Sequence, residues 1–140
     1  MDKLSGRCAC GNVTWTSPGP VLWAVHCHCD SCRRANASAM VSFFGVPRET
    51  VSRIGDMTVR KSSNGVERGF CAQCGSQVLY ESEVWPDETH LYAATLDDPD
   101  QFKPTAHVHW NEKVYWLKID DDLPKYPGSA DNTQPIADHS

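Results

Sequence analysis

Seven cysteines in three close groups constrain this chain more than any other feature of its sequence. The groups read C-x-C at residues 8–10, C-x-C-x-x-C at residues 27–32 and C-x-x-C-G at residues 71–75. An odd number of cysteines cannot pair completely within one chain, and clustered cysteines in a reducing compartment bind metal more often than they form lasting disulfides. The spacing therefore predicts metal-binding groups rather than a disulfide framework.

The first and third groups together supply four thiols for one ion. Cys8 and Cys10 share a face on an extended strand, because side chains two positions apart point the same way. Cys71 and Cys74 flank a tight turn followed by glycine, which is typical of a zinc knuckle. Four thiolates around Zn²⁺ leave no open position, so a structural zinc site is predicted. A redox pair or buried free thiols are the alternatives, but the β-α-β context of a redox C-x-x-C is not visible.

The middle group has three thiols and lacks a fourth. In an extended segment Cys27 and Cys29 share one face, and Cys32 returns on the following turn. Three protein ligands with one exchangeable position are the pattern of a catalytic zinc. Zinc with three thiolates is soft and a weak Lewis acid, so its favoured fourth ligand is another thiolate. The sequence therefore predicts a substrate thiol whose pKa the metal lowers.

The alternative is that a histidine completes the middle group and makes it structural. In an extended segment His28 points away from the neighbouring cysteines, which makes it a poor ligand. His107 or His109 could arrive from a distant strand, and on one strand they would share a face. Either could equally line a pocket or lie on the surface. The open and closed forms of the site are both compatible with the sequence.

Several other side chains are candidates for contact with the substrate. They are Arg33 and Arg34 for an anionic carboxylate, His107, His109 and His26 for proton transfer, and Tyr80 and Trp110 for the pocket walls. Guanidinium groups match carboxylates and offset thiolate charge, and imidazoles titrate near neutral pH. Aromatic residues in strands more often belong to a core. We assign His107 to catalysis and His109 to substrate binding.

Short segments rich in β-branched and aromatic residues dominate the chain, and long helical periodicity is absent. The expected strands are 13–15, 21–25, 40–46, 58–61, 66–70, 77–80, 90–96, 106–110 and 114–117. Asn64-Gly65 predicts a hairpin turn. A short helix is expected over Asp30–Ala39, capped by Asp30 or Ser31, and a second helical turn after Pro47. The sequence predicts a mainly β fold of short antiparallel strands in two facing sheets.

Length and charge narrow the class of protein. The 140 residues suit one domain, which we place at residues 1–127, followed by a loosely ordered tail at 128–140. A formal net charge of −5, with 13 basic and 18 acidic residues, argues against a nucleic-acid partner. The acidic run Asp120-Asp121-Asp122 is interpreted as a solvated turn.

The location of the protein is predicted from two sequence features. No apolar run approaches the ~20 residues of a membrane-spanning helix, so no membrane partner is expected. The opening residues MDKLSGRC lack the apolar core of a signal peptide. These features predict a cytoplasmic protein.

The motifs together resemble those of a known family. GRCACG, HCHCDSCRR, GFCAQCGSQVLY and a late H-V…W…D-L-P-K-Y segment are similar to the glutathione-dependent formaldehyde-activating enzyme family, which shares its domain with centromere protein V. The resemblance covers roughly residues 4–127. Members often read C-R-x-x-T-G-S-A after the middle group, whereas this chain has Asn36 and Ala37 in place of Thr and Gly.

The resemblance implies a β-tent fold of antiparallel sheets held by zinc, and it implies two zinc ions. Cys8, Cys10, Cys71 and Cys74 would hold the structural ion, and Cys27, Cys29 and Cys32 the catalytic ion, which we expect to be only partly occupied. The activity of the family is formation of S-(hydroxymethyl)glutathione from formaldehyde and glutathione, classed as a carbon–sulfur lyase.

Three functions remain open from the sequence. The first is a zinc-dependent carbon–sulfur lyase that activates a small thiol, such as glutathione, for addition to a small electrophile such as formaldehyde, or for release from it. The second is a non-catalytic, zinc-stabilised binding module. The third is an oxidant sensor or metal buffer, but no resolving cysteine favours it.

Overall fold

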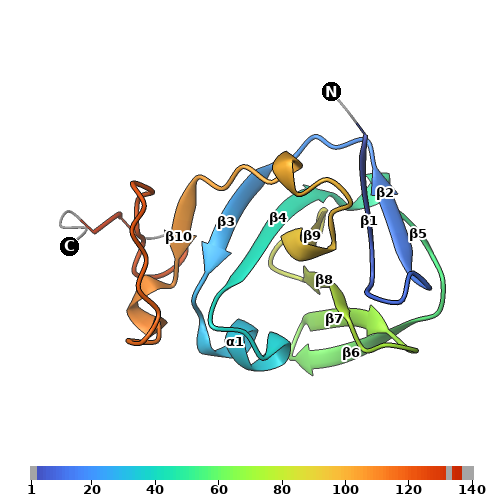
Figure 1. The fold of residues 1–140 in the computed structure, drawn as a ribbon, viewed down its shortest axis with the longest axis horizontal. Helices are drawn as coiled ribbons and strands as arrows, with labels where there is room; N and C mark the ends of the chain where they lie inside the picture. The colour runs from blue at the N-terminus through green and yellow to red at the C-terminus, as the bar shows by residue number, and fades with distance from the viewer. Residues whose placement is uncertain (1–2, 132–133, 137–140) are drawn as a thin grey trace. The chain divides into compact units, whose positions relative to one another are not determined.

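The computed structural model describes residues 3–131 and 134–136 (Figure 1). The contacts form two compact units, and neither is continuous along the chain. Unit 1 consists of the chain up to Trp23 together with Phe44–Lys103, and unit 2 consists of Ala24–Phe43 together with the chain from Pro104 onward. A single domain over residues 1–127 stays a prediction.

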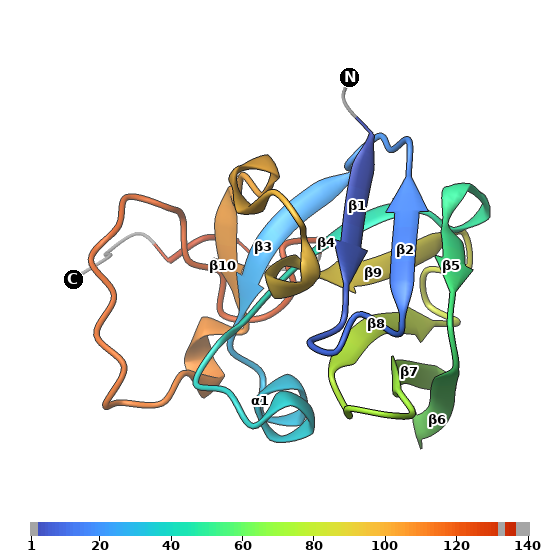
Figure 2. The same cartoon turned by 45° about the vertical axis from the view of Figure 1, so that its right-hand side comes forward.

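One part of unit 1 is a three-stranded antiparallel sheet. It contains β1 (Leu4–Arg7), β2 (Thr14–Ser17) and β5 (Ser52–Ile54) in the order β1-β2-β5 (Figure 2). Trp15 of β2 is 1% exposed, and its indole Nε1 donates to Thr95 Oγ1 at 3.0 Å. The sequence did not indicate β1 or β5, because LSGR and SRI are short and largely polar, and every residue of β5 is exposed.

The other part of unit 1 is a run of antiparallel strands. These are β6 (Met57–Ser63), β7 (Val66–Cys71), β8 (Gln77–Ser82) and β9 (Glu88–Tyr92), paired in chain order. Asn64-Gly65 connects β6 to β7, as predicted. Val78, Leu79 and Leu91 are buried and contribute to the core of unit 1. The expected strand 90–96 ends at Tyr92, because 3₁₀ turn η2 (Ala93–Thr95) follows.

Two further 3₁₀ turns belong to unit 1. Turn η1 (Arg48–Thr50) follows Pro47, where a helical turn was expected, and η3 (Pro99–Gln101) is capped by the Asp98 side chain. Strand β4 (Val41–Pro47) begins in unit 2 and ends in unit 1. The prediction of a mainly β fold with antiparallel sheets and few short helical turns is confirmed.

Unit 2 contains the C-terminal part of β3 (Trp23–Cys27), α1 (Asp30–Asn36), β10 (Ala106–Val108) and η4 (Trp110–Glu112). Figure 1 shows β10 beside β3, and it shows α1 following the C-terminal end of β3. The β3–β10 pairing is parallel, which departs from the expected antiparallel arrangement, and its register places His107 opposite His26. Strand β3 therefore brings the cysteine-rich segment next to the histidine of β10.

The expected strand at 114–117 is wrong. Tyr115 and Trp116 lie in a turn and are 82% and 60% exposed. The Lys113 ammonium donates to the carbonyls of Val114 at 2.8 Å and Leu117 at 2.6 Å, which closes this loop on itself. The strand propensity of residues 114–117 did not predict their structure, because strand propensity reflects packing against a neighbouring strand.

Helix α1 is shorter than the predicted Asp30–Ala39, and its cap differs from the prediction. Cys29 is the N-cap, and its Sγ accepts from the Cys32 N–H at 3.3 Å, where Asp30 or Ser31 had been expected. The helix ends at Asn36, and its C-cap Ala37 adopts the left-handed region with φ 49°. Glycine is the usual residue at such an end, since its lack of Cβ removes the steric penalty.

Replacing Ala37 by glycine is expected to stabilise the protein by about 1 kcal/mol, because the left-handed conformation is strained for alanine. The matched control is Ala35→Gly inside α1, which should destabilise the protein by about 1 kcal/mol. Chemical denaturation of the metal-loaded protein measures both free energies of unfolding. Destabilisation by both variants would contradict the left-handed helix end.

The chain after η4 is tied to unit 2 at several points. The His109 N–H donates to Gly128 O at 2.9 Å, and the Ile136 N–H donates to Lys125 O at 2.7 Å. Residues 132–133 and 137–140 of the predicted loose tail lie outside the described residues, so the tail stays a prediction. No helix in the described part of the chain is both long and apolar enough to cross a membrane.

Candidate metal centres

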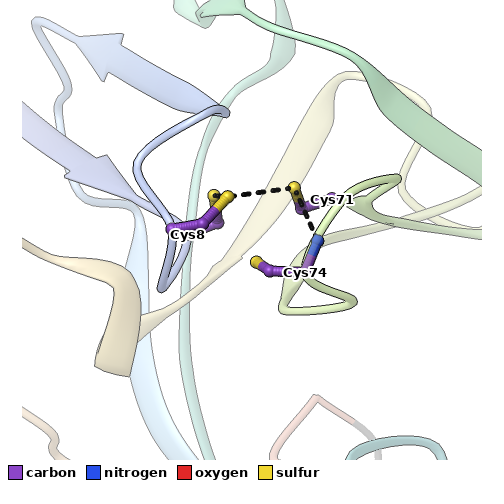
Figure 3. Close-up of side chains that lie close together, drawn as sticks. Cys8, Cys71 and Cys74 are labelled. Carbon is purple, nitrogen blue, oxygen red and sulfur yellow. Dashed lines mark hydrogen bonds between the residues drawn. The ribbon is translucent and has the colours of Figure 1, made fainter.

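Four thiols from two loops of unit 1 converge on one point. The sulfurs of Cys8, Cys10, Cys71 and Cys74 all lie within 4.8 Å of one another. Cys8 and Cys71 are 1% and 0% exposed, whereas Cys10 and Cys74 are exposed. Figure 3 shows the side chains of Cys8, Cys71 and Cys74 turned towards the same space between the loops. The grouping of these four residues agrees with the sequence prediction.

Backbone N–H groups point at the sulfurs of this cluster. The Val13 N–H donates to Cys8 Sγ at 3.2 Å, and the Cys74 N–H donates to Cys71 Sγ at 3.4 Å. Each loop turns at a glycine with positive φ, Gly11 at 81° and Gly75 at 80°. Glycine adopts this conformation without steric penalty, which lets each loop fold around its sulfurs.

The electrostatics of the four thiols fit a cation. A hydrogen bond with Ser76 lowers the pKa of the Cys74 thiol to about 5. Several thiolates at this spacing repel one another unless a positive ion lies between them. The Arg7 guanidinium donates to the carbonyls of Cys8 and Ala9 at 3.4 Å, which helps to hold the first loop in place. The cluster could therefore hold a metal ion, and an all-sulfur donor set suits zinc.

Three thiols in unit 2 form a second cluster. The sulfurs of Cys27, Cys29 and Cys32 also lie within 4.8 Å of one another. Cys27 ends β3, Cys29 caps α1 and Cys32 lies in the first turn of α1. Cys27 and Cys32 are buried, and Cys29 is half-buried. The strand-to-helix turn therefore brings together the three thiols that the sequence spacing predicted.

The second cluster also fits a cation. Hydrogen bonding with Cys29 and Cys32, together with burial, raises the pKa of the Cys27 thiol well above its usual range. These protons are hard to remove because thiolates at this spacing repel one another in a buried setting. A bound cation removes that penalty, since a coordinated thiol is deprotonated. Three soft donors suit zinc and leave a tetrahedral ion one ligand short.

The two arginines after the triplet are engaged within unit 2. Arg33 Nε donates to His28 O at 3.1 Å, and the Arg33 side chain is 19% exposed. Arg34 is 79% exposed, and its Nε lies 2.9 Å from Asp30 Oδ1. Arg33 thus holds the backbone between two of the cysteines, and Arg34 forms a surface ion pair. A role for either in binding a substrate carboxylate stays a prediction.

Three histidines gather beside the triplet. His28 Nε2 lies 2.9 Å from His107 Nδ1, and His26 Nδ1 lies 2.7 Å from Ser42 Oγ. The rings of His26 and His107 are 5.0 Å apart between centroids. Burial, with a further contribution from the neighbouring His107, lowers the pKa of His28 to about 4, so this ring is neutral near pH 7. Sequence reasoning had set His28 aside and did not anticipate this pair.

The remaining predicted residues lie in different surroundings. Trp110 meets the rings of His28 and His107 edge-on, with centroids 5.0 and 5.1 Å away. His109 does not share a face with His107, because β10 ends at Val108 and His109 turns into the left-handed region with φ 55°. Its Nδ1 lies 3.5 Å from Glu112. Tyr80 belongs to unit 1, where it stacks on His90 at 5.4 Å.

Asp121 is exposed, in line with the interpretation of Asp120-Asp121-Asp122 as a solvated turn, but it also has specific partners in unit 2 that the sequence did not indicate. Its Oδ2 lies 2.8 Å from His107 Nε2, and its Oδ1 accepts from Lys125 Nζ at 3.1 Å. Lys125 is only 2% exposed. No local pattern distinguished Asp121 from its neighbours, because its partner is 14 positions away in sequence.

Comparisons with known proteins show what this chain is similar to. The sequence model of a family described as "Glutathione-dependent formaldehyde-activating enzyme" matches residues 3–112. A Halomonas elongata protein named "Putative glutathione-dependent formaldehyde-activating enzyme" is 27% identical over an alignment of 129 residues, and the alignment covers 84% of this chain and 81% of that protein. A crystal structure of a Rhodobacter sphaeroides protein matches with a TM-score of 0.59 at 19% identity, covering 74% of this chain and 99% of the other. That last match shows a shared fold. Asp121 and Lys125 lie beyond the residues matched by the family.

Proposed function

This chain belongs to the glutathione-dependent formaldehyde-activating enzyme family, and on that premise we propose that it is a zinc-dependent enzyme of the carbon–sulfur lyase type. Its substrates are a small thiol, glutathione or a relative, and a small electrophile such as formaldehyde. The observation that carries the proposal is the difference between the clusters, since one gathers four thiols and the other three. A complete set of ligands suits a structural ion, and a set one ligand short suits a reactive one.

The reaction joins a thiol to a carbonyl carbon. The S–H bond breaks, a C–S bond forms, and the carbonyl oxygen gains the proton, so formaldehyde and a thiol give a hydroxymethyl thioether. The reverse reaction releases the same two compounds. When bound by Cys27, Cys29 and Cys32, zinc would supply stabilisation of the substrate sulfur as a thiolate.

The residues of unit 2 hold the site and offer a path for the proton. Arg33 anchors the carbonyl of His28, which keeps the segment between Cys27 and Cys29 in place. His107 is our candidate for proton transfer, because its imidazole bonds to His28 on one side and to Asp121 on the other. We assign substrate contact to Arg33, Arg34 and His109, because guanidinium and imidazole groups can bind an anionic substrate.

We propose a cytoplasmic location, which is supported by the absence of a disulfide among the seven cysteines, all of which lie in the described residues. The net charge of −5 supports partners other than nucleic acid. A non-catalytic binding module is the second candidate, favoured by the exposed Tyr115 and Trp116, because exposed aromatic residues suit contact with a partner.

The experiment is a metal count followed by a thiol titration. We expect two zinc ions per chain at full loading, with the second one lost more easily. After replacement of the second ion by Co²⁺, added glutathione should strengthen the thiolate-to-cobalt absorption, because a fourth sulfur joins the three cysteines. S-methylglutathione is the matched control, since it has no free thiol. One ion per chain, or a cobalt spectrum that glutathione leaves unchanged, would contradict the proposal.

A further inference from the structure

The peptide groups on both sides of Cys29 are held by charged side chains. The carbonyl of His28, in the peptide group before Cys29, accepts from Arg33 Nε at 3.1 Å. The N–H of Asp30, in the peptide group after Cys29, donates to Glu112 Oε1 at 3.0 Å. Because each peptide group is planar, anchoring both of them fixes the two backbone dihedrals of the residue between them. Cys29 is held in an extended conformation in this way, with φ −64° and ψ 148°.

The anchor after Cys29 comes from a distant part of the chain. Glu112 is 82 positions from Asp30 and is the last residue of η4. The pairing of β3 with β10 continues past both strands, because the His28 N–H donates to Val108 O at 3.1 Å. His109 then turns the chain in the left-handed region, and its carbonyl accepts from the Glu112 N–H at 3.0 Å. The turn after β10 therefore places a carboxylate at the start of α1.

Two of the three thiols of the second cluster belong to this start of α1. Cys29 is the N-cap, and its Sγ accepts from the Cys32 N–H at 3.3 Å. The Asp30 N–H is among the first N–H groups of the helix, which have no acceptor within the helix itself. A hydrogen bond to a carboxylate is stronger than one to a neutral acceptor. Glu112 therefore stabilises the turn that holds the sulfurs of Cys29 and Cys32 together.

The side chain of Glu112 lies at the surface. It is 45% exposed, and its Oε2 lies 3.5 Å from His109 Nδ1. Removal of an exposed side chain opens no cavity in a core, so it costs little overall stability. An effect of Glu112 on the cysteine triplet can therefore be measured without unfolding the protein.

We propose that Glu112 is a positioning residue for the second metal centre, which acts through the Asp30 N–H and fixes Cys29 in the conformation that binds the ion. The proposal rests on the proposed zinc ion at Cys27, Cys29 and Cys32, but not on the proposed reaction. Loss of a group that orients a metal ligand typically lowers metal affinity by about 10–100-fold. The lower end of this range is expected here, because the hydrogen bond is made to the backbone and lies at the surface.

Two variants of Glu112 separate its hydrogen bond from its charge. Glu112→Ala should bind the second zinc ion about 10-fold more weakly than the wild type. Glu112→Gln should bind it within about threefold of the wild type, because the amide oxygen can accept from the Asp30 N–H in place of Oε1. Asp122→Ala is the matched control, since it removes an exposed carboxylate from the same unit, and it should leave the affinity unchanged.

Two measurements read the outcome without turnover. Competition with a chromophoric chelator gives the affinities of the two ions, and Cys29→Ser identifies the ion of the triplet because this variant is expected to lose it. Proton–nitrogen NMR of the zinc-loaded protein reads the Asp30 N–H directly. Its proton should shift upfield in Glu112→Ala, where the carboxylate acceptor is lost, and stay close to the wild-type position in Glu112→Gln. Circular dichroism checks that each variant is folded.

Equal affinity of the wild type and Glu112→Ala for the second ion would overturn the proposal. Equal weakening in Glu112→Ala and Glu112→Gln would also overturn it, because the amide keeps the acceptor, and so would an unchanged Asp30 N–H signal in Glu112→Ala. A wild type that binds one ion would overturn this proposal together with the proposed function. If the expected affinities are found but the wild type does not accelerate the reaction, the positioning role is supported and the proposed function fails.

Discussion

Replacing Cys71 by serine is expected to unfold unit 1 and to abolish binding of the first zinc ion. Cys71 is 0% exposed, and its Sγ accepts N–H groups from Gln73 and Cys74 at 3.4 Å. A structural zinc site contributes about 10–16 kcal/mol to folding, whereas the net stability of a domain is about 5–15 kcal/mol. If loss of this ligand abolishes zinc binding, the free energy that is lost is therefore comparable with the whole net stability of the domain.

Far-UV circular dichroism, amide NMR dispersion and zinc content measure this outcome. We expect collapsed NMR dispersion and at most one weakly bound ion. The same loss should follow when a strong chelator strips the wild type of both ions, because the two treatments remove the same centre. A folded Cys71→Ser variant that still binds two ions would show that the four-thiol cluster is not a structural zinc site.

Replacing Cys29 by serine is expected to abolish thiol-dependent turnover while the fold survives. Cys29 is the half-buried member of the triplet and the N-cap of α1, with its Sγ accepting from the Cys32 N–H at 3.3 Å. Serine is itself a favoured N-cap, so the helix keeps its start. A hydroxyl is a harder and weaker zinc ligand than a thiolate. The variant should therefore lose the second ion alone.

The expected loss in kcat is roughly 1,000-fold or more, since a metal that stabilises developing charge contributes several kcal/mol. The assay is exchange of ¹³C-formaldehyde into its glutathione adduct by NMR, with zinc content measured on the same samples. Full activity in a Cys29→Ser variant that holds one ion would exclude a catalytic triplet. If the wild-type protein holds two ions but does not accelerate the exchange of formaldehyde into its glutathione adduct, the non-catalytic binding module would be favoured.

The predictable part of this fold comes from local patterns. The hairpin at Asn64-Gly65 and the turn after Pro47 were found because turn residues act over a few positions. Strands β1 and β5 were missed because their sequences carry no alternation of apolar residues, and they exist only as neighbours of β2. The segment 114–117 was misassigned for the opposite reason, since its strand-like sequence has no strand to pair with in the described part of the chain.

The sequence by itself identified the three cysteine groups, because the thiols within each group lie only two to five positions apart in the chain. That Cys8 and Cys10 meet Cys71 and Cys74 was decided by the fold. Only the tertiary structure decided what surrounds the triplet. His28 and His107 are 79 positions apart and meet because β10 pairs with β3 in one particular register. The same fold gives His107 its partner Asp121 from an acidic run with three equivalent candidates. Hydrogen-bond partners of this kind depend on where distant segments lie, and spacing along a chain carries no information about that.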